Sequence, residues 1–427
     1  MIKRIARSII VHISWGFANA FTRRFKPRII GVVGSVGKSG TKRSIALTLS
    51  GSKSVAWQDG NYNDLVTVPL IFFGLTAPSL FNPIAWLWVF MRMFACIVRG
   101  QKVDVVVLEL GTDAPGQIAA FGKHVHLDTL VITAIEPEHM IQFKTLANVA
   151  REELSAVKFA SSIYLDESID RTFLGTDFPA YQTYGKNPAS TNVFSINNDI
   201  VSVHTANKTY SIHPKLIGEH QYRGITVAIA IAESLGIDFS SIEHAVEAIT
   251  PMSGRMQLLR GKEGSIIIDD SYNSSPAAAK AALNYLYGLP QAHKVAILGS
   301  MNEMGSESAS LHNQLGALCD PTKLEIVITI GADANEYLAP AAKARRCTVK
   351  SFDSPFLAAD YLATFTLADT ALLFKGSQNG VFVEEAIKSI LADPLDAKRL
   401  VRQSSSWLNI KHKQFPVIKK SSVTKTT

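Results

Sequence analysis

The sequence predicts an α/β protein with two successive domains, each built on a mainly parallel sheet. Three observations predict this fold. Short apolar runs typical of buried strands alternate with helical patterns along most of the chain. The alternation changes character over residues 190–213 and restarts at about residue 253. A length of 427 residues with 47% hydrophobic residues is enough to bury two or three domain cores.

The first domain, which we assign to residues 27–252, begins with the apolar run 28–33. This run leads into a glycine-rich turn, and a helix follows from about Ser39. Further strands are expected over 103–110 and 128–134, and a helix over 222–235 that ends at Gly236. Strands that alternate with helices indicate a parallel, doubly wound sheet. The short runs of 190–213, separated by Asn-Asn and Asn-Lys pairs, predict an inserted β-hairpin.

The second domain, which we assign to residues 253–412, restarts the alternation after a boundary near Pro251 to Arg255. Its expected strands cover 265–270, 294–299, 324–331 and 370–376. Residues 413–427 are polar and basic, so a disordered tail is expected there.

The N-terminal residues 1–26 are predicted to form a basic amphipathic helix. Residues 1–58 hold eleven Lys or Arg and no acidic residue, in a chain of net charge +7. Apolar side chains recur at helical spacing at Ile2, Ile5, Ile9, Ile13, Phe17 and Phe21. Such a helix suits the surface of an anionic membrane or a nucleic acid. The alternative is a solvated basic face close to a phosphate-binding site.

A second apolar run covers residues 83–98 and contains Arg92. It is short for a membrane span, so a buried or interfacial helix is expected. The three cysteines, Cys96, Cys319 and Cys347, are far apart in the sequence, which argues against a disulfide framework or a zinc site. We therefore expect a cytoplasmic protein, with peripheral contact at the inner face of the membrane through residues 1–26.

The sharpest local signal is a glycine-rich phosphate loop between the first strand and its helix. It reads Gly34, Ser35, Val36, Gly37, Lys38 and Ser39, followed by Gly40. The loop is two residues shorter than the common P-loop pattern. Backbone N–H groups and the helix N-terminus can still face phosphates, while Lys38 reaches the terminal phosphates and Ser39 ligates Mg²⁺. The expected cofactors are ATP and Mg²⁺; the alternative is a glycine turn with a surface lysine.

Further polar side chains follow the expected strands, where open α/β sheets place their ligands. Glu109 closes one strand, and His139 follows another, so the pair could bind a second Mg²⁺ or position a phosphate. Taken alone, His139 is more often a loop histidine. The segment 269–273, DDSYN, follows a strand as well, although by itself it could be a turn with an Asx cap.

These motifs, in this order, resemble the Mur ligase family over roughly residues 28–390. Within the family they are most similar to the D-alanyl-D-alanine-adding, MurF-like branch. The resemblance rests on GRMQLLRGKEGSIIIDDSYNSSP (254–276), ILGSMNEMGSESASLH (297–312), LLFKGS (372–377), the phosphate loop and NYNDLVTVP (61–69).

The resemblance implies a central ATPase domain and a C-terminal Rossmann-like domain that closes over it. It implies an acid–amino acid ligase of peptidoglycan precursor synthesis, in which the γ-phosphate of ATP passes to a substrate carboxylate. An amine then attacks the acyl phosphate to give an amide, ADP and phosphate. The implied partners are a carboxylate acceptor, such as a UDP-muramyl peptide, and an amino acid or dipeptide as amine donor. No nucleic acid partner is expected.

The resemblance also implies a role for each matching residue. Lys38 would stabilise the transferring phosphoryl group, and Ser39 with Glu109 would hold one Mg²⁺. His139 would hold a second metal. Residues at the nucleotide and interdomain face would be Arg255, Asp270, Tyr272 and Asn273. Substrate-binding residues would be Asn61, Asn63, Lys375, Gly376 and Ser377.

The sequence departs from the family pattern at several of these places. Glu153 stands where the family has a lysine whose carbamate bridges to the metal. We hypothesise that the Glu153 carboxylate replaces the carbamate; the alternative is a solvated helix glutamate beside Glu152. The remaining departures are Gln221 and Gly224, where asparagines are expected, Ser300 for an aspartate and Gln378 for an arginine. They leave adenine recognition and the identity of the amine donor open.

The phosphate loop begins at residue 34, and the family's uridine-nucleotide-binding domain is not recognised before it. A membrane-associated or lipid-linked acceptor would fit the basic helix and the run at 83–98. Two other functions remain open. One is a ligase for a peptide outside the cell wall, such as a folate-type glutamate ligase. The other is a nucleotide-binding but catalytically weak regulator or scaffold.

Overall fold

The computed structural model describes residues 2–60, 62–197 and 200–415 of the chain. The chain divides into two compact units, residues 1–250 and 251–427. Each unit holds one sheet whose strands are joined by helices, which confirms the α/β class. The division falls next to Pro251, at the beginning of the boundary expected from the sequence.

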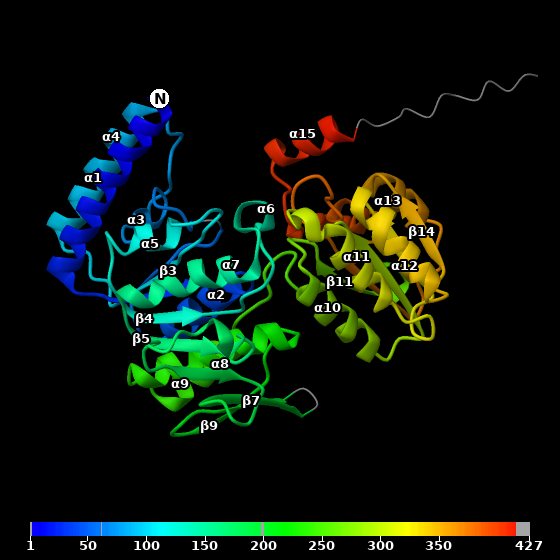
Figure 1. Cartoon of the computed structure of the whole chain (residues 1–427), viewed down its shortest axis with the longest axis horizontal. Coiled ribbons are helices and arrows are strands. Elements are labelled where there is room, and N and C mark those ends of the chain that lie inside the picture. The colour runs from blue at the N-terminus through cyan, green and yellow to red at the C-terminus, as the bar shows by residue number, and fades with distance from the viewer. Residues whose placement is uncertain (1, 61, 198–199, 416–427) are drawn as a thin grey trace, which may run out of the picture. The chain divides into compact units, whose positions relative to one another are not determined.

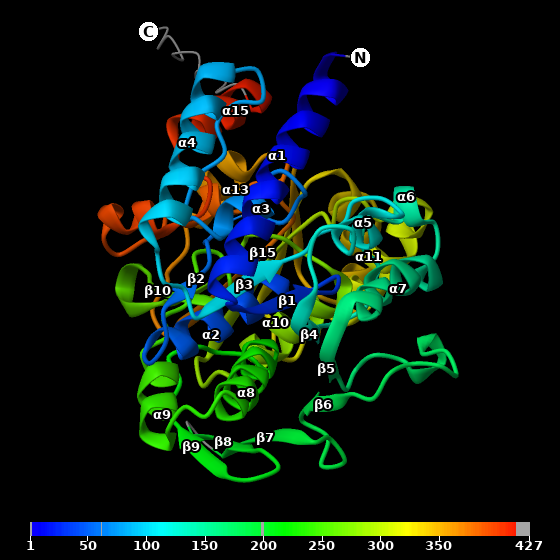
Figure 2. The same cartoon turned by 90° about the vertical axis from the view of Figure 1, so that its left-hand side faces the viewer.

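The first unit is built on a nine-stranded sheet in the order β2-β3-β1-β4-β5-β6-β7-β8-β9 (Figure 2). Neighbours from β2 to β7 run parallel, while β7–β8 and β8–β9 are antiparallel. The expected hairpin therefore extends the edge of the same sheet. Its Asn-Asn pair includes Asn198, which lies outside the described residues. The strands are β1 (Arg28–Val33), β2 (Val55–Ala56), β3 (Val105–Glu109), β4 (Leu127–Ile132), β5 (Ala160–Asp166), β6 (Gln182–Gly185), β7 (Asn192–Asn197), β8 (Ile200–His204) and β9 (Thr209–Ile212).

Helices cover both faces of this sheet, as a parallel sheet requires (Figure 1). Ile30 and Val32 of β1 pack with α2, α8 and α9, while Ile29 and Val33 pack on the side of α1, α3, α4, α5 and α7. Because both faces of the sheet are buried, the sequences of its parallel strands are continuous apolar runs. The helices are α1 (Ile2–Phe25), α2 (Lys38–Ser50), α3 (Val68–Ile71), α4 (Pro83–Arg99), α5 (Gln117–Phe121), α6 (Met140–Phe143), α7 (Leu146–Leu154), α8 (Glu219–Ser234) and α9 (Phe239–Glu247), with short 3₁₀ turns at Ser155–Phe159 and Arg171–Phe173.

Helix α1 is amphipathic, but its apolar residues do not share one face. Ile5, Ile9 and Ile13 are exposed, whereas Trp15 and Phe21 are buried in the core. The row of apolar residues from Ile5 to Phe21 therefore does not form a single stripe. Each residue turns the helix by about 100°, so a row of every fourth residue drifts by about 40° per step and reaches the opposite side.

The second unit is built on a six-stranded sheet in the order β10-β11-β15-β12-β13-β14. Strands β10 and β11 are antiparallel, and the other neighbours are parallel. The four strands expected from the sequence are present within two residues at each end. The strands are β10 (Gln257–Arg260), β11 (Ile266–Asp270), β12 (His293–Gly299), β13 (Ile326–Ile330), β14 (Val349–Phe352) and β15 (Thr370–Lys375).

Six α-helices connect or flank these strands in the described part of the unit. They are α10 (Pro276–Gly288), α11 (Ser308–Ala317), α12 (Ala339–Ala344), α13 (Pro355–Leu362), α14 (Glu384–Ile387) and α15 (Ser405–Gln414). Short turns lie at Lys262–Gly264, Gly305–Glu307, Ala334–Leu338 and Pro394–Arg399. Helix α15 includes residues 413 and 414, which were expected in the disordered tail, because the buried Lys411 pairs with Glu384 at 2.8 Å and Glu385 at 2.6 Å. Residues 416–427 of that tail lie outside the described residues.

No helix in the described ranges is long and apolar enough to cross a membrane. Helix α4, formed by the apolar run at 83–98, packs one side against the core through Trp86, Val89 and Met93. The three cysteines are unpaired, with Cys96 half-buried and the other two buried.

Candidate active site

The phosphate loop joins the carboxyl end of β1 to the first turn of α2. Gly34 and Gly37 adopt positive φ angles of 122° and 93°. A side chain at Gly34 would place its Cβ 2.2 Å from Thr133 Oγ1 and 3.0 Å from the Ala134 carbonyl oxygen. The Ser35 N–H also donates to that carbonyl, at 2.8 Å. The loop is thus held against the end of β4, and the N-terminus of α2 is available to an anion.

Lys38 lies over its own loop. Its ammonium donates to the Gly34 and Ser35 carbonyl oxygens, the latter at 3.0 Å, and lies 3.4 Å from Glu138 Oε2. A bound phosphate would offer Lys38 stronger acceptors than these carbonyls.

The pKa of Lys38 is raised despite its burial. Burial lowers the pKa of this ammonium, but the carboxylates of Glu138, Glu153 and Glu109 outweigh that effect. Lys38 is therefore a fixed positive charge at the loop.

Ser39 and Glu109 lie together, as the sequence predicted. The Ser39 hydroxyl donates to Glu109 Oε1 at 3.1 Å. The other carboxylate oxygen of Glu109 pairs with Lys42 Nζ at 3.0 Å, and both of these side chains are almost fully buried. Lys42 lies one turn after Lys38 on α2 and thus fixes the orientation of the Glu109 carboxylate.

Glu153 is buried and faces the phosphate loop from α7. Its Oε2 accepts a hydrogen bond from the Gly34 N–H at 2.9 Å. Burial raises the pKa of Glu153 to about 7, even though Lys38 and the Gly34 N–H oppose the shift. The alternative of a solvated helix glutamate is therefore wrong. Glu152 has a separate role, since its carboxylate accepts the Gly116 and Ile118 N–H groups at 2.7 Å each.

His139 begins α6 with a left-handed backbone conformation, φ 51°. Its Nε2 lies 3.4 Å from Asp113 Oδ1 and 3.7 Å from Glu138 Oε1. Glu138 thus faces both Lys38 and His139, so the loop after β4 carries an acidic side chain on the phosphate side.

The predicted substrate loop packs beside β3. The Gly111 N–H donates to the Asn63 carbonyl oxygen at 2.8 Å, and a Cβ at Gly111 would clash with the Asn63 side chain. Asn63 is therefore held next to the end of the strand that carries Glu109. Asn61 lies outside the described residues. The carbonyl of its neighbour Gly60 lies 3.3 Å from Lys42 Nζ.

Gly224, which stands at an expected asparagine, allows α8 to approach α2 closely. A Cβ on this residue would lie 3.3 Å from Thr41 Cα, so a larger side chain would push the helices apart. Gln221 lies one turn earlier and faces Gly40, where a Cβ would lie 3.4 Å from Gln221 Oε1. Gln221 therefore remains beside the nucleotide loop, while Gly224 serves helix packing.

The second unit gathers its own predicted site residues at the ends of β11 and β15. Lys375 Nζ pairs with Asp270 Oδ2 at 3.0 Å, and both side chains are buried. The same ammonium donates to the Asn273 carbonyl oxygen. Burial lowers the pKa of Lys375; Asp270 partly offsets that effect, and the positive charge of Arg255 adds to it. The buried pair thus ties the DDSYN segment to the neighbouring strand.

The remaining residues of this unit lie around that pair. The Arg255 guanidinium lies over the Tyr272 ring, 4.1 Å from its centroid. Ser377 accepts the Asn302 N–H on its hydroxyl at 2.9 Å and donates its own N–H to the Ser300 carbonyl at 3.1 Å. A Cβ on Gly376 would lie 2.7 Å from a Val383 methyl group, so glycine is required there.

Ser300 and Gln378, the two residues of this unit that depart from the family pattern, also make hydrogen bonds around the Lys375 segment. Ser300 Oγ accepts the Ala334 N–H at 3.1 Å, and the Gln378 carbonyl accepts from Asn302 Nδ2 at 2.6 Å. The Ser300 side chain is thus part of the loop structure of the second unit, whereas Gln378 contributes only a main-chain carbonyl that any residue would provide.

The comparisons with known proteins agree with this geometry. The Mur ligase middle domain matches residues 32–232, and the Mur ligase glutamate ligase domain matches residues 254–378. Together they cover most of the chain. This chain belongs to the Mur ligase family.

Several relatives and solved structures place this Mur ligase near MurF. The UDP-N-acetylmuramoyl-tripeptide–D-alanyl-D-alanine ligase of Bacillus subtilis is 24% identical over 88% of the chain and 79% of the relative. The Synechocystis enzyme of the same name is 26% identical over 88% and 77%. The MurF structure from Thermotoga maritima in complex with ADP has a TM-score of 0.72 at 21% identity, covering 89% of this chain and 83% of that one. The chain is a MurF-like, ATP-dependent, ADP-forming ligase.

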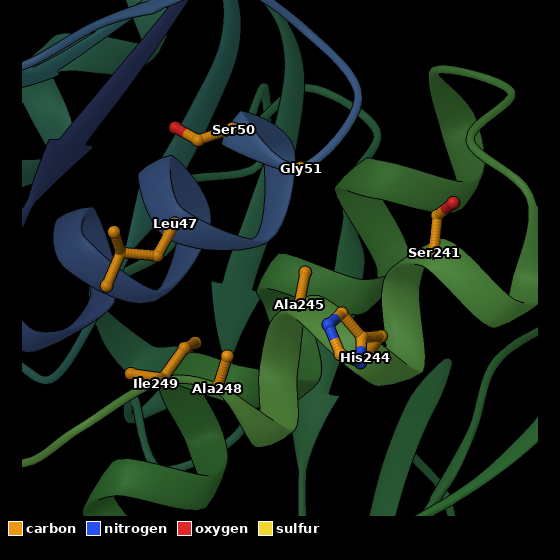
Figure 3. A pocket seen from close by; sticks show the side chains of 8 residues that line it. All are labelled: Leu47, Ser50, Gly51, Ser241, His244, Ala245, Ala248 and Ile249. Atoms are coloured by element: carbon orange, nitrogen blue, oxygen red, sulfur yellow. The ribbon is translucent and has the colours of Figure 1, made fainter.

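A pocket of about 370 Å³ in the first unit is distinct from the Mur ligase phosphate loop (Figure 3). It lies between the last turn of α2 and α9. Its polar lining side chains are Ser50, Ser241 and His244, and no lysine or arginine lines it to pair with a phosphate. Its lining residues are Leu47, Ser50, Gly51, Ser241, His244, Ala245, Ala248 and Ile249.

Three residues of this Mur ligase were missed in the sequence. Lys42 could have been noticed because it lies four residues after Lys38 and so on the same side of α2. Glu138 could have been noticed because it immediately precedes His139 in the sequence. Arg402 donates to the Ser271 and Tyr272 carbonyls at 2.7 and 2.9 Å. Because these partners are far from it in the sequence, no local sequence pattern indicates the contact.

Proposed function

We propose that this ligase joins the carboxylate of a UDP-muramyl tripeptide to the amine of D-alanyl-D-alanine, as the names of its relatives describe for those enzymes. The observation that carries the proposal is the position of the Ser39 hydroxyl, which lies 3.1 Å from Glu109 Oε1. Ser39 directly follows Lys38 at the end of the phosphate loop. These groups suit phosphoryl transfer from ATP to a second anion.

The reaction has two steps. A carboxylate oxygen of the acceptor bonds to the γ-phosphorus while the bond to the β-phosphate oxygen breaks, and ADP leaves. The amine then attacks the acyl carbon, phosphate leaves, and the nitrogen loses a proton. Lys38 and the loop N–H groups hold the γ-phosphoryl oxygens as their charge shifts.

The donor set at Ser39 and Glu109 fits Mg²⁺, because a hydroxyl and a carboxylate oxygen are ligands that this ion prefers. Among the described residues, no three His, Cys, Asp or Glu side chains gather as a metal site. That suits an ion that takes the rest of its ligands from phosphate and water. When bound, Mg²⁺ would neutralise phosphate charge.

Glu153 and His139 would act on the same phosphate. The Glu153 carboxylate braces the phosphate loop through Gly34 and would replace the family's carbamate, while His139 would hold the second metal. Glu138 lies between Lys38 and His139, so its charge bears on both groups.

The second unit would contribute Arg255, Asp270, Tyr272 and Asn273 to nucleotide binding. Lys375, Gly376 and Ser377 of the second unit would help bind the amine substrate or the phosphate. Asn61 and Asn63 of the first unit would belong to a substrate-binding loop. The ligase would work at the inner face of a membrane, with residues 1–26 in peripheral contact.

The test is phosphate release from Mg-ATP with each substrate alone and with both together. We expect release that needs both, and loss of it in Lys38→Ala, while the exposed Lys350→Ala retains it. ATP binding without substrate-dependent release would overturn the proposal in favour of a regulator or scaffold. Release with a folate-type acceptor and glutamate, but not with the muramyl peptide, would favour a ligase outside the cell wall.

A further inference from the structure

Helix α4 presents an apolar stripe to solvent. The exposed side chains recur at spacings of three and four residues, which places them on one side of the helix. The opposite side, with Trp86, Val89 and Met93, is buried in the core. The stripe comprises Ile84 (79% exposed), Leu87 (59%), Trp88 (50%), Met91 (55%), Phe94 (60%) and Val98 (55%).

Helix α1 extends this surface. It lies beside α4 in both views of the chain (Figures 1 and 2), and Phe17 stacks on Phe90 with 6.2 Å between ring centroids. Ile5, Ile9 and Ile13 are exposed on α1. We call these nine exposed residues of the two helices the α1–α4 face. Exposed apolar side chains that gather in this number on two adjacent helices indicate an interaction site.

The surroundings of the face are basic. Lys3, Arg4 and Arg7 are exposed in the first two turns of α1, and Arg99 is exposed at the end of α4. Arg92 lies within the stripe, its guanidinium 4.4 Å from the centroid of a Trp88 ring. The sequence has no Asp or Glu over residues 1–58 or 65–103. A partner for this face must therefore accept apolar side chains and carry negative charge.

We propose that the α1–α4 face docks on the surface of an anionic lipid bilayer. Apolar side chains enter the boundary between headgroups and acyl chains, while the basic side chains meet the lipid phosphates. A second copy of the chain is a poorer partner, because it would bring an equally basic face against the first. With no described helix able to cross a membrane, the contact is peripheral.

The docking helix α1 also supports the predicted substrate loop. Trp15 Nε1 donates to the Leu65 carbonyl at 3.0 Å, and Arg7 lies 3.5 Å from Asp64. The same loop includes Asn63. Docking therefore holds the helix that supports this loop at the lipid surface. The substrate-binding role of this loop rests on the proposed function, and the docking deepens the peripheral contact proposed there for residues 1–26.

The experiment is cosedimentation of the full chain with vesicles of phosphatidylcholine alone or with added phosphatidylglycerol. We expect binding to the phosphatidylglycerol vesicles that weakens with salt. The variant Leu87→Ser, Met91→Ser and Phe94→Ser should weaken it by about tenfold or more, since three apolar anchors are lost. Absence of binding to both vesicles, or unchanged binding by this variant, overturns the proposal.

A matched control replaces apolar residues that are equally exposed on the second unit. Leu357→Ser with Leu395→Ser, at 50% and 68% exposure, should bind vesicles as the unaltered chain does. The charge requirement is tested by Arg4→Gln with Lys3→Gln, which should lower binding to phosphatidylglycerol vesicles severalfold. Self-association that disappears in the Leu87, Met91 and Phe94 variant, without vesicle binding, would assign the face to a second copy.

Phosphate release in lipid-free buffer separates the two proposals. The stripe contains none of the candidate site residues, so its variant should release phosphate at the rate of the unaltered chain. Lack of substrate-dependent release in both proteins would overturn the proposed function and leave the vesicle result standing. Normal release without vesicle binding would overturn the docking and the peripheral contact of residues 1–26, and would leave the ligase reaction standing.

Discussion

Lys42 Nζ lies 3.0 Å from Glu109 Oε2, and the two side chains are 1% and 3% exposed. The other oxygen of Glu109 meets the Ser39 hydroxyl. The buried ammonium thus holds a carboxylate in place beside the phosphate loop. Replacing Lys42 would leave Glu109 buried without its counter-ion, so the pair links the stability of the first unit to its chemistry.

We predict that Lys42→Met destabilises the protein by about 3 kcal/mol, the usual result of removing one partner of a buried ion pair. Urea unfolding measures the change. Lys102→Met is the matched control, because Lys102 is 86% exposed and its pair with Asp104 at 3.8 Å contributes little. Equal stability of the two variants would show that Glu109 does not depend on Lys42.

We predict that Glu153→Gln makes stability less dependent on pH. In the folded protein the pKa of Glu153 is about 7, above its ordinary value of 4.5. The folded state therefore binds a proton that the unfolded state has lost, and stability falls as the pH rises from about 4.5 to 7. Glutamine does not titrate, so this decline, about 3 kcal/mol at most, should disappear from thermal or urea unfolding across that range.

The same substitution should lower Mg²⁺-dependent turnover if Glu153 replaces the carbamate. The control is Glu152→Gln, which changes the neighbouring glutamate. Glu152 holds the Gly116 and Ile118 N–H groups instead of the phosphate loop, so that variant should lose stability with little change in nucleotide affinity. Unchanged kinetics in Glu153→Gln would remove Glu153 from the mechanism.

The strand–turn–helix at residues 28–50 could be predicted because the apolar run of the strand and the glycines of the turn lie within one short segment. The pairing of Ser39 with Glu109 was implied by the family resemblance, and it forms because β1 and β3 run parallel and end at one edge of the sheet. Arg402 could not be predicted from a local pattern, since its partners are far away in the sequence. The spacing of Lys42 from Lys38 indicates its side of α2 but not that its partner is Glu109. The exposed side of α4 was equally hidden, because a helix that is apolar all round does not show which side is buried.

We predict that Glu138→Gln tightens ATP binding by about two- to fivefold. Glu138 lies 3.4 Å from Lys38 and competes with phosphate for that ammonium, and partly exposed pairs are worth changes of this size. Calorimetric titration with ATP measures the effect, and Glu325→Gln, in an exposed pair with His293, should change nothing. Weaker binding by Glu138→Gln would instead make Glu138 a ligand of the metal.

We predict that Arg402→Lys loosens the DDSYN segment of the second unit. Arg402 donates to two carbonyls of that segment and pairs with Glu384 at 2.7 Å, and a lysine cannot reproduce this fork. A loss of about 1–3 kcal/mol in unfolding free energy is expected, together with a raised KM for ATP. Arg399→Lys, in an exposed pair with Asp396, is the control; a similar loss there would contradict the assignment.

The central claim is transfer of the γ-phosphoryl group to a carboxylate, and oxygen isotope transfer tests it most directly. An acceptor labelled with ¹⁸O in its carboxylate is incubated with Mg-ATP and the amine, and the released phosphate is analysed by mass spectrometry. An acyl phosphate leaves one labelled oxygen on each phosphate released, and Lys38→Ala should release none. Release of unlabelled phosphate at the rate of amide formation would contradict the account.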